Sequence, residues 1–231
     1  MQTAGKGRAR LLVAAAATGL ILVVASQVQA RPEKRFYAGV GLMGSRISGD
    51  VDGKEVLSKS PQYGPDVYLG KLDNGGGFSG AFGMVLGKYL AVELNIGRTG
   101  HDATHEALPG RTFSATVSSF APMVRGMFPL GDSYEIFALL GPETISVEYE
   151  ENAQLPPNPT YFGSQVTGTG GAGALGFAWY FADRLGAEVV LMREDTRLRS
   201  VTAADQEFEK IHLDFVRGSA QIRVTYHFKD R

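Results

Sequence analysis

Six charged residues stand out because each lies among small residues in a stretch that is otherwise apolar. They are Glu93, Arg125, Glu135, Glu188, Arg217 and Arg223. Burying a charge is very costly unless an opposite charge and hydrogen bonds accompany it. We therefore expect these charges to pair with one another.

Two polar segments carry groups that bind metals in other proteins. His101-Asp-Ala-Thr-His-Glu106 holds two histidines and two carboxylates, which suit a transition metal. It lies in a predicted loop, where the spacing does not place both rings on one face. Asp50-Val-Asp-Gly53 begins like a calcium loop but lacks the later acidic positions and the closing glutamate. We interpret both as solvated loops and expect no metal.

The glycine-rich run Gly168-Thr-Gly-Gly-Ala-Gly173 superficially matches a dinucleotide-binding fingerprint. That motif requires a helix directly after the glycines. Here Leu175 to Phe181 alternates as a strand does, so we expect no cofactor.

The first thirty residues are typical of a secretory signal peptide. Lys6, Arg8 and Arg10 precede an apolar run, and Val28-Gln-Ala30 is a small-x-small cleavage site before Arg31. Removing residues 1–30 leaves 20 basic and 24 acidic residues, a net charge of −4, which argues against nucleic acid as a partner. The chain contains no cysteine, so neither a disulfide nor thiol chemistry is expected. Residues 31–231 are predicted to form one domain.

Apolar and small residues alternate along most of the mature chain. In one stretch, large apolar residues take one face (Leu90, Val92, Leu94, Ile96) and small or polar residues take the other (Ala91, Glu93, Asn95, Gly97). The pattern predicts strands at 36–47, 78–87, 89–98, 112–128, 134–141 with an extension towards 149, 165–181, 185–192 and 210–228. A soluble barrel has its large apolar side chains inside, whereas this pattern is typical of a barrel surrounded by lipid.

The connections alternate between long and short. Short turns are expected at 87–88, 129–132 and 182–184, and long polar segments follow the first, third, fifth and seventh strands. Outer-membrane barrels have short periplasmic turns and long extracellular loops. Aromatic residues cluster beside the short turns, as at a membrane interface: Phe128, Tyr134, Trp179, Tyr180, Phe181, Tyr226 and Phe228. The predicted fold class is all-β, an eight-stranded antiparallel up-and-down transmembrane β-barrel.

Three stretches give a resemblance to a known family. Phe36-Tyr-Ala-Gly-Val-Gly-Leu42, Val92-Glu-Leu94 and Ile222-Arg-Val-Thr-Tyr-His-Phe228 are similar to the small eight-stranded outer-membrane β-barrels typified by the OmpA transmembrane domain and OmpX. The resemblance implies the Gram-negative cell envelope, periplasmic termini, and an assembly signal that includes Tyr226 and Phe228. It also implies contact with outer-membrane lipid and lipopolysaccharide, with the barrel-assembly machinery and with periplasmic chaperones.

The leading functional hypothesis is a non-enzymatic structural or surface-interaction protein whose loops meet an extracellular ligand or a host surface. In the barrel, the charges would lie in the lumen near the periplasmic end, where they form either a salt-bridged plug or the gate of a narrow, porin-like ion channel. The third alternative is an enzyme acting on lipid A, for which His212 with Asp214 is the only pair worth testing. A soluble periplasmic barrel is disfavoured because it would expose an apolar band to water.

Overall fold

The computed structural model describes residues 36–49, 55–56, 67–68, 71–104, 112–149, 161–162, 165–203, 206–208 and 213–228. The predicted signal peptide with its cleavage site, the segment 50–53, His105, Glu106 and His212 lie outside these residues. None of the described residues belongs to a helix long and apolar enough to cross a membrane.

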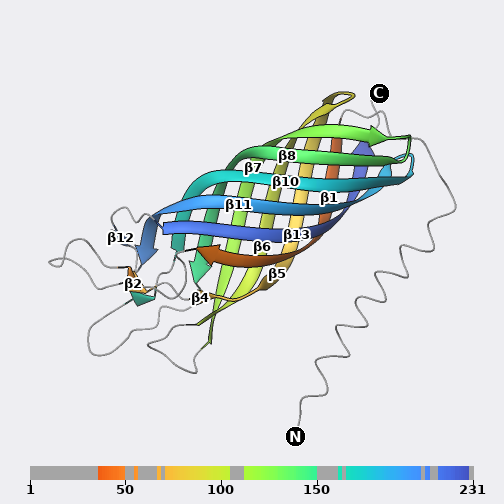
Figure 1. Cartoon of the computed structure of the whole chain (residues 1–231). Helices are drawn as coiled ribbons and strands as arrows, with labels where there is room; N and C mark the ends of the chain where they lie inside the picture. The colour runs from red at the N-terminus through yellow and green to blue at the C-terminus, as the bar shows by residue number, and fades with distance from the viewer. Residues whose placement is uncertain are drawn as a thin grey trace, which may run out of the picture.

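Eight long strands follow one another around a closed barrel (Figure 1). They are β1 (Phe36–Gly49), β5 (Gly75–Gly87), β6 (Leu90–Thr104), β7 (Thr112–Leu130), β8 (Tyr134–Tyr149), β10 (Gln165–Ala182), β11 (Leu185–Ala203) and β13 (Leu213–Phe228). Consecutive strands pair antiparallel, and β1 pairs with β13 from Phe36↔Phe228 to Gly49↔Phe215, which closes the sheet. The predicted all-β, eight-stranded antiparallel barrel is confirmed.

Five short strands lie in the connections at the end opposite the short turns. β4 (Lys71–Leu72) pairs with β6, and β12 (Gln206–Phe208) pairs with β11. β2 (Glu55–Val56), β3 (Val67–Tyr68) and β9 (Tyr161–Phe162) form a separate three-stranded sheet. The connections that follow β1, β6, β8 and β11 are called the long connections below.

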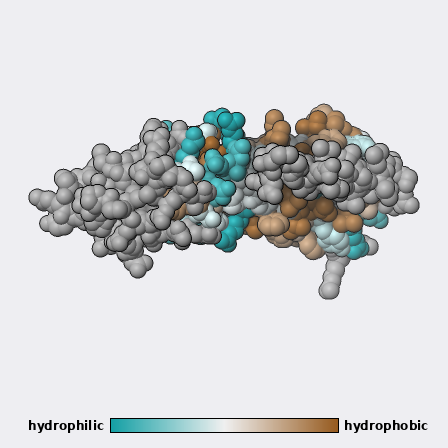
Figure 2. All heavy atoms as spheres, turned by 90° about the horizontal axis from the view of Figure 1, so that it is seen from below, coloured by the Kyte–Doolittle hydropathy of each residue, from teal (hydrophilic) through white to brown (hydrophobic). Residues whose placement is uncertain are grey.

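The two faces of the barrel wall are inverted relative to a soluble protein. Large apolar side chains point outward, and Val40 and Leu140 are 73% and 72% exposed. Figure 2 shows them gathered in a band over one half of the barrel, with hydrophilic side chains beside it towards the long connections. Only a lipid environment removes such a band from water.

Two predicted strand ends were wrong in the same way. His101–Thr104 was predicted as loop but continues β6, and the strand predicted to end at 192 continues to Ala203 in β11. In both places charged residues point outward beyond the apolar band, as Asp102 and Arg193 do. Polarity on one face resembled a loop, although the alternation of a strand continued.

One pair of prolines interrupts the hydrogen-bond ladder of the wall. Pairing of β7 with β8 runs to Phe120↔Thr144 and resumes at Val124↔Leu140 in the same register, so Pro122 lies opposite Pro142. Neither residue carries an N–H, so the hydrogen bonds that such a pair would exchange are missing.

Side chains fill the described lumen as two apolar clusters. The cluster nearer the long connections includes Phe113, Ile145, Leu198 and Phe215, and the other includes Tyr37, Met123, Phe137 and Tyr180. An eight-stranded barrel has an interior of about this capacity. The polar residues described next are packed within and between these clusters.

Candidate functional site

Strand register brings the predicted charges together near the short turns. Glu188 on β11 lies directly opposite Arg223 on β13. Glu93 on β6 lies opposite Met123 on β7, so Arg125 is two residues along on the same inward face. Four of these charges lie within a few residues of a short turn, and Arg223 lies five residues before the end of β13 at Phe228. All five therefore share a common depth.

Five of the six predicted residues form one buried ion-pair network, called the lower network below: Glu93, Arg125, Glu135, Glu188 and Arg223. The guanidinium of Arg125 contacts Glu93, Glu135 and Glu188, each at 2.9 Å. Arg223 contacts Glu93 at 3.1 Å and Glu188 at 3.0 Å. All five side chains are at most 3% exposed. The two arginines thus tie together carboxylates from three strands across the lumen.

Neutral side chains complete the lower network, and sequence reasoning missed them. The Tyr37 hydroxyl donates a hydrogen bond to Glu93 at 2.5 Å, and Arg223 donates one to the Asn95 amide oxygen at 2.7 Å. The Arg125 guanidinium lies 3.6 Å from the centre of the Phe137 ring, a cation–π contact. All three residues belong to the inward face of a predicted strand. Their partners depend on how far neighbouring strands are staggered.

Arg217 does not join this network, in contrast to the prediction. It lies opposite Glu194 in the β11–β13 register and binds that carboxylate through Nε and Nη2. Its Nη2 also donates to Ser119 at 2.6 Å and lies 3.7 Å from Glu143. Arg217, Glu143 and Glu194 form a second buried layer, called the upper network, which lies closer to the long connections. Sequence reasoning did not identify either carboxylate.

Both networks contain one more acid than base. The lower network has three carboxylates and two guanidiniums, and the upper network has two carboxylates and one guanidinium. Charges so deeply buried stay in place only when they are paired and hydrogen-bonded. Together the two networks can close the lumen. Their excess of carboxylates can also admit a small cation if the ion pairs exchange partners.

His101 has a structural environment at the long-connection end of the lumen. Its Nδ1–H donates to the Asp73 carbonyl oxygen at 2.7 Å, so Nε2 accepts from Thr99 at 2.8 Å and from Ser45 at 3.2 Å. The described part of the chain contains no group of three or more His, Cys, Asp or Glu side chains placed to hold a metal. Asp214, the other half of the proposed lipid A pair, points outward and lies 3.5 Å from Arg197.

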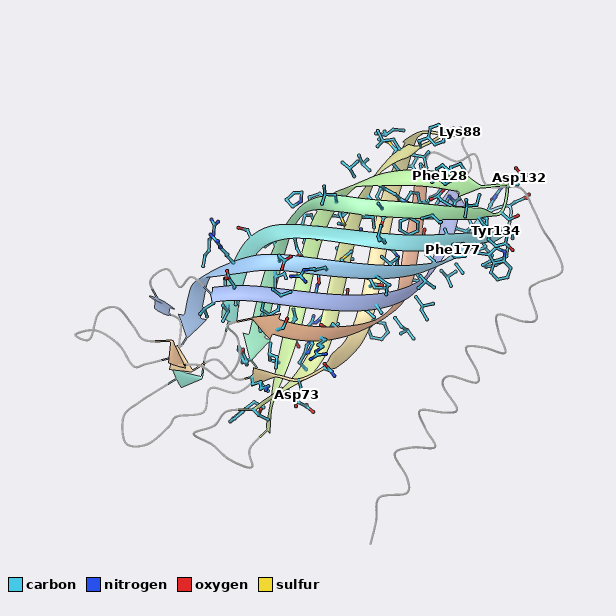
Figure 3. The ribbon with its side chains drawn as sticks, viewed as in Figure 1. Asp73, Lys88, Phe128, Asp132, Tyr134 and Phe177 are labelled. Carbon is cyan, nitrogen blue, oxygen red and sulfur yellow. The ribbon has the colours of Figure 1, made fainter. Side chains whose placement is uncertain are left out.

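The ends of the barrel differ as the sequence predicts, except that Tyr180, which was expected in the aromatic belt, is buried in the lumen. Figure 3 shows Phe128, Tyr134 and Phe177 around the turn that contains Asp132, at the end opposite Asp73. The rings of Tyr134 and Phe177 stack with centroids 5.8 Å apart. Tyr226 and Phe228 lie at the last residues of β13 with ring centroids 5.2 Å apart, and their part in assembly stays a prediction. Gly168–Gly173 lies within β10, as the strand pattern predicted.

Comparison with known proteins places this fold among outer-membrane barrels. The family model of the outer membrane protein beta-barrel domain matches residues 14–228. The structure is similar to the outer membrane protein OprG from Pseudomonas aeruginosa, with 15% identity and a TM-score of 0.55, over 88% of this chain and 100% of that chain. Neisserial surface protein A gives 9% identity and 0.50 over 84% and 97%, and the outer membrane protein AlkL gives 10% and 0.50 over 89% and 96%. At these identities the likeness concerns the fold alone. No curated protein matches the sequence.

Proposed function

Because the chain belongs to the outer membrane protein beta-barrel domain family, and so to the Gram-negative outer membrane, we propose that it is a surface-interaction protein. In this proposal the long connections are extracellular and form the binding surface. The short turns, the start of β1 at Phe36 and the end of β13 at Phe228 face the periplasm. The lumen is closed, and its charges hold the wall rigid.

The height of the wall on the side of the long connections supports the proposal most directly. β7 and β11 each contain 19 residues, whereas a tilted strand needs about 9–11 to cross the hydrocarbon. About eight surplus residues, at ~3.3 Å each and tilted by ~40°, would raise the wall by about 20 Å. Outward charges such as Arg193 and Arg197 suit this part to water and headgroups. A barrel that served only as a membrane span would not need this extension.

The closed lumen supports a role at the surface rather than in the passage of solutes. The lower network crosses the interior at one depth, and the upper network crosses it at a second depth. A solute would have to separate ion pairs at both depths, and breaking a buried pair costs about 3–5 kcal/mol.

The composition of the long connections indicates the chemistry of the partner. Segments 50–74, 105–111, 150–164 and 204–212 together carry 11 acidic and 5 basic residues, a net charge of −6. Complementary charge raises association rates and selects partners. We therefore propose an extracellular partner, such as a host surface, with a basic contact surface.

The test compares cells that display the protein with cells that display a variant neutralised at Glu150, Glu151, Asp205 and Glu207. Adhesion to beads coated with lysozyme, a basic protein, should fall in the variant and in high salt, and adhesion to heparin-coated beads should stay low throughout. Heat-dependent gel mobility checks that the variant barrel is folded. Equal adhesion of both cell types to the lysozyme beads would contradict the proposal.

A narrow channel is the second candidate, and one observation favours it. On the inward face of β13, Ser219 Oγ and Gln221 Oε1 lie on one side of Arg223 and Thr225 Oγ1 lies on the other, and none of these three atoms has a hydrogen-bond partner within the described structure. Buried polar atoms of this kind usually bind water. Exchanging Glu93 with Arg125 should then change the single-channel current in planar bilayers. Unchanged currents would exclude the lower network as a gate.

Two further expectations belong to the same proposal. We propose that Tyr226 and Phe228 act in recognition by the barrel-assembly machinery and its chaperones, so Phe228→Ala should lower the amount of folded protein in the outer membrane. We propose no enzymatic activity. A changed lipid A mass spectrum on overexpression would contradict that statement.

A further inference from the structure

Two outward arginines share one row of the barrel wall. In the strand registers, Arg46 on β1 and Arg193 on β11 both lie opposite Gly218 on β13. All three residues are exposed on the outer face. Adjacent strands are about 4.8 Å apart, so the two arginine Cα atoms are separated by about 10 Å. A Cβ added to Gly218 would meet nothing within 4 Å, so the wall between the two side chains is open.

This row lies at the upper border of the apolar band. One row towards the short turns, Gly44, Ala220 and Leu191 are opposite one another, and Leu191 is 62% exposed. Arg46 and Arg193 are the first outward charges beyond the band on their strands. Basic side chains at this depth meet the phosphates of lipid headgroups.

We propose that Arg46 and Arg193 form a binding site over Gly218 for the phosphate groups of lipid A, the phosphorylated glycolipid anchor of lipopolysaccharide. The choice of lipid A rests on the proposed function, which places the long connections and this border in the outer leaflet. Guanidinium groups bind phosphate through two parallel hydrogen bonds, and the open glycine lets a headgroup approach the wall between them.

Asp195 modulates this site. Its carboxylate accepts hydrogen bonds from Arg193 Nε at 2.9 Å and Nη2 at 3.1 Å, which leaves Nη1 for a further acceptor. The contact orients the guanidinium along β11 but places a negative charge beside the phosphate. Replacing Asp195 by asparagine removes that repulsion, so it should strengthen lipid A binding. Two rows further towards the long connections, Arg197 is similarly accompanied by Asp214 at 3.5 Å.

Arg98 provides a matched control within the same barrel. It is also an outward arginine just beyond the apolar band, two residues after Ile96 on β6. Its register partners are Phe78 and Ser118, so its row places no second arginine on the neighbouring strands. If charge alone were responsible, Arg98→Ala would weaken binding as much as a change in the proposed site.

The experiment measures dissociation constants of the folded mature barrel in detergent micelles by native mass spectrometry. The probes are lipid A, lipid A with its phosphates removed, and phosphatidylglycerol. Arg46→Ala and Arg193→Ala should each weaken lipid A binding about fivefold, the double variant about 25-fold. Asp195→Asn should strengthen it, and Arg98→Ala should change it less than twofold. Heat-dependent gel mobility verifies the folding of each variant.

Three results would overturn the inference: unchanged binding in the double variant, an equal loss in Arg98→Ala, or equal affinity for the dephosphorylated lipid. Equal affinity for phosphatidylglycerol would overturn the choice of lipid A. The assay does not depend on which end of the barrel faces outward. Failure of bead adhesion with intact lipid A binding would therefore contradict the proposed function and leave this site standing.

Discussion

Replacing Arg125 by methionine tests whether the lower network holds the barrel together. Methionine keeps much of the apolar volume and removes the charge, so the experiment isolates the electrostatic part of the contact. In the variant, Glu93 and Glu188 retain Arg223 at 3.1 and 3.0 Å. Glu135 loses its ion pair with Arg125, which in the native structure measures 2.9 Å.

The expected loss follows from the burial of the site. Removing one partner of a buried pair costs about 3–5 kcal/mol, because the remaining charge stays in a poorly solvated place. Arg125 also contributes the cation–π contact with Phe137, which adds ~0.5–2 kcal/mol. We therefore expect Arg125→Met to lower the free energy of unfolding by at least about 3 kcal/mol.

Glu135→Gln provides the matched change. It leaves two carboxylates for two guanidiniums, so alone it should lower the free energy of unfolding by less than about 1 kcal/mol. Added to Arg125→Met, it should restore at least ~1 kcal/mol of the free energy of unfolding that Arg125→Met removes. Arg125→Lys keeps the charge but loses the planar fork that reaches three carboxylates. Its stability should lie between those of the native protein and Arg125→Met.

The assay is urea unfolding of the barrel in lipid vesicles, followed by the emission of Trp179. This residue is the only tryptophan of the chain and packs against Phe181 with ring centroids 5.5 Å apart. Unfolding moves the indole from the barrel surface into water and shifts its emission. A loss of less than about 1 kcal/mol for Arg125→Met would show that the lower network does not stabilise the wall.

Three further predictions concern the wall and the upper network. Pro122→Ala and Pro142→Ala each restore one ladder hydrogen bond, so the double variant should be more stable in urea by about 1–3 kcal/mol. A less stable double variant would show that the missing hydrogen bonds do not weaken the pairing of β7 with β8. Gly141→Ala should reduce the yield of folded barrel on gels, because the added Cβ would lie 2.1 Å from the backbone oxygen of Pro122. Gly126→Ala should fold normally, because its Cβ would meet nothing within 4 Å. Arg217→Met should cost about 3–5 kcal/mol in the same unfolding assay; a loss comparable to that of an exposed arginine would contradict the upper network.

The strands and their faces could be predicted because alternation is a local property. Glu93 and Arg125 were assigned to the lumen from their immediate neighbours. In the structure both side chains are at most 3% exposed. The short turns added a common depth for residues within a few positions of them. That reasoning covers the lower network.

The upper network could not be predicted because its contacts depend on the stagger of strands far from a turn. Arg217 lies six residues before Arg223, and only the register with β11 shows that its partner is Glu194. Glu143 was missed because it lies where the pattern changes faces: beyond Pro142 the apolar residues of β8, such as Ile145 and Val147, point inward and the polar residues point outward. His101 was assigned to a loop for the related reason that outward polarity beyond the membrane resembles a loop.

The measurement that tests the inverted barrel most directly is spin-label accessibility at two adjacent residues of β11. The chain has no cysteine, so Leu191→Cys and Val190→Cys each carry a single label. Leu191 is 62% exposed on the outer face, and Val190 is fully buried in the lumen. In lipid vesicles, a label at 191 should be reached by oxygen and shielded from a water-soluble nickel complex, and a label at 190 should show little access to oxygen. The reverse pattern would contradict the account, because it would show that residue 190 faces lipid and residue 191 faces water.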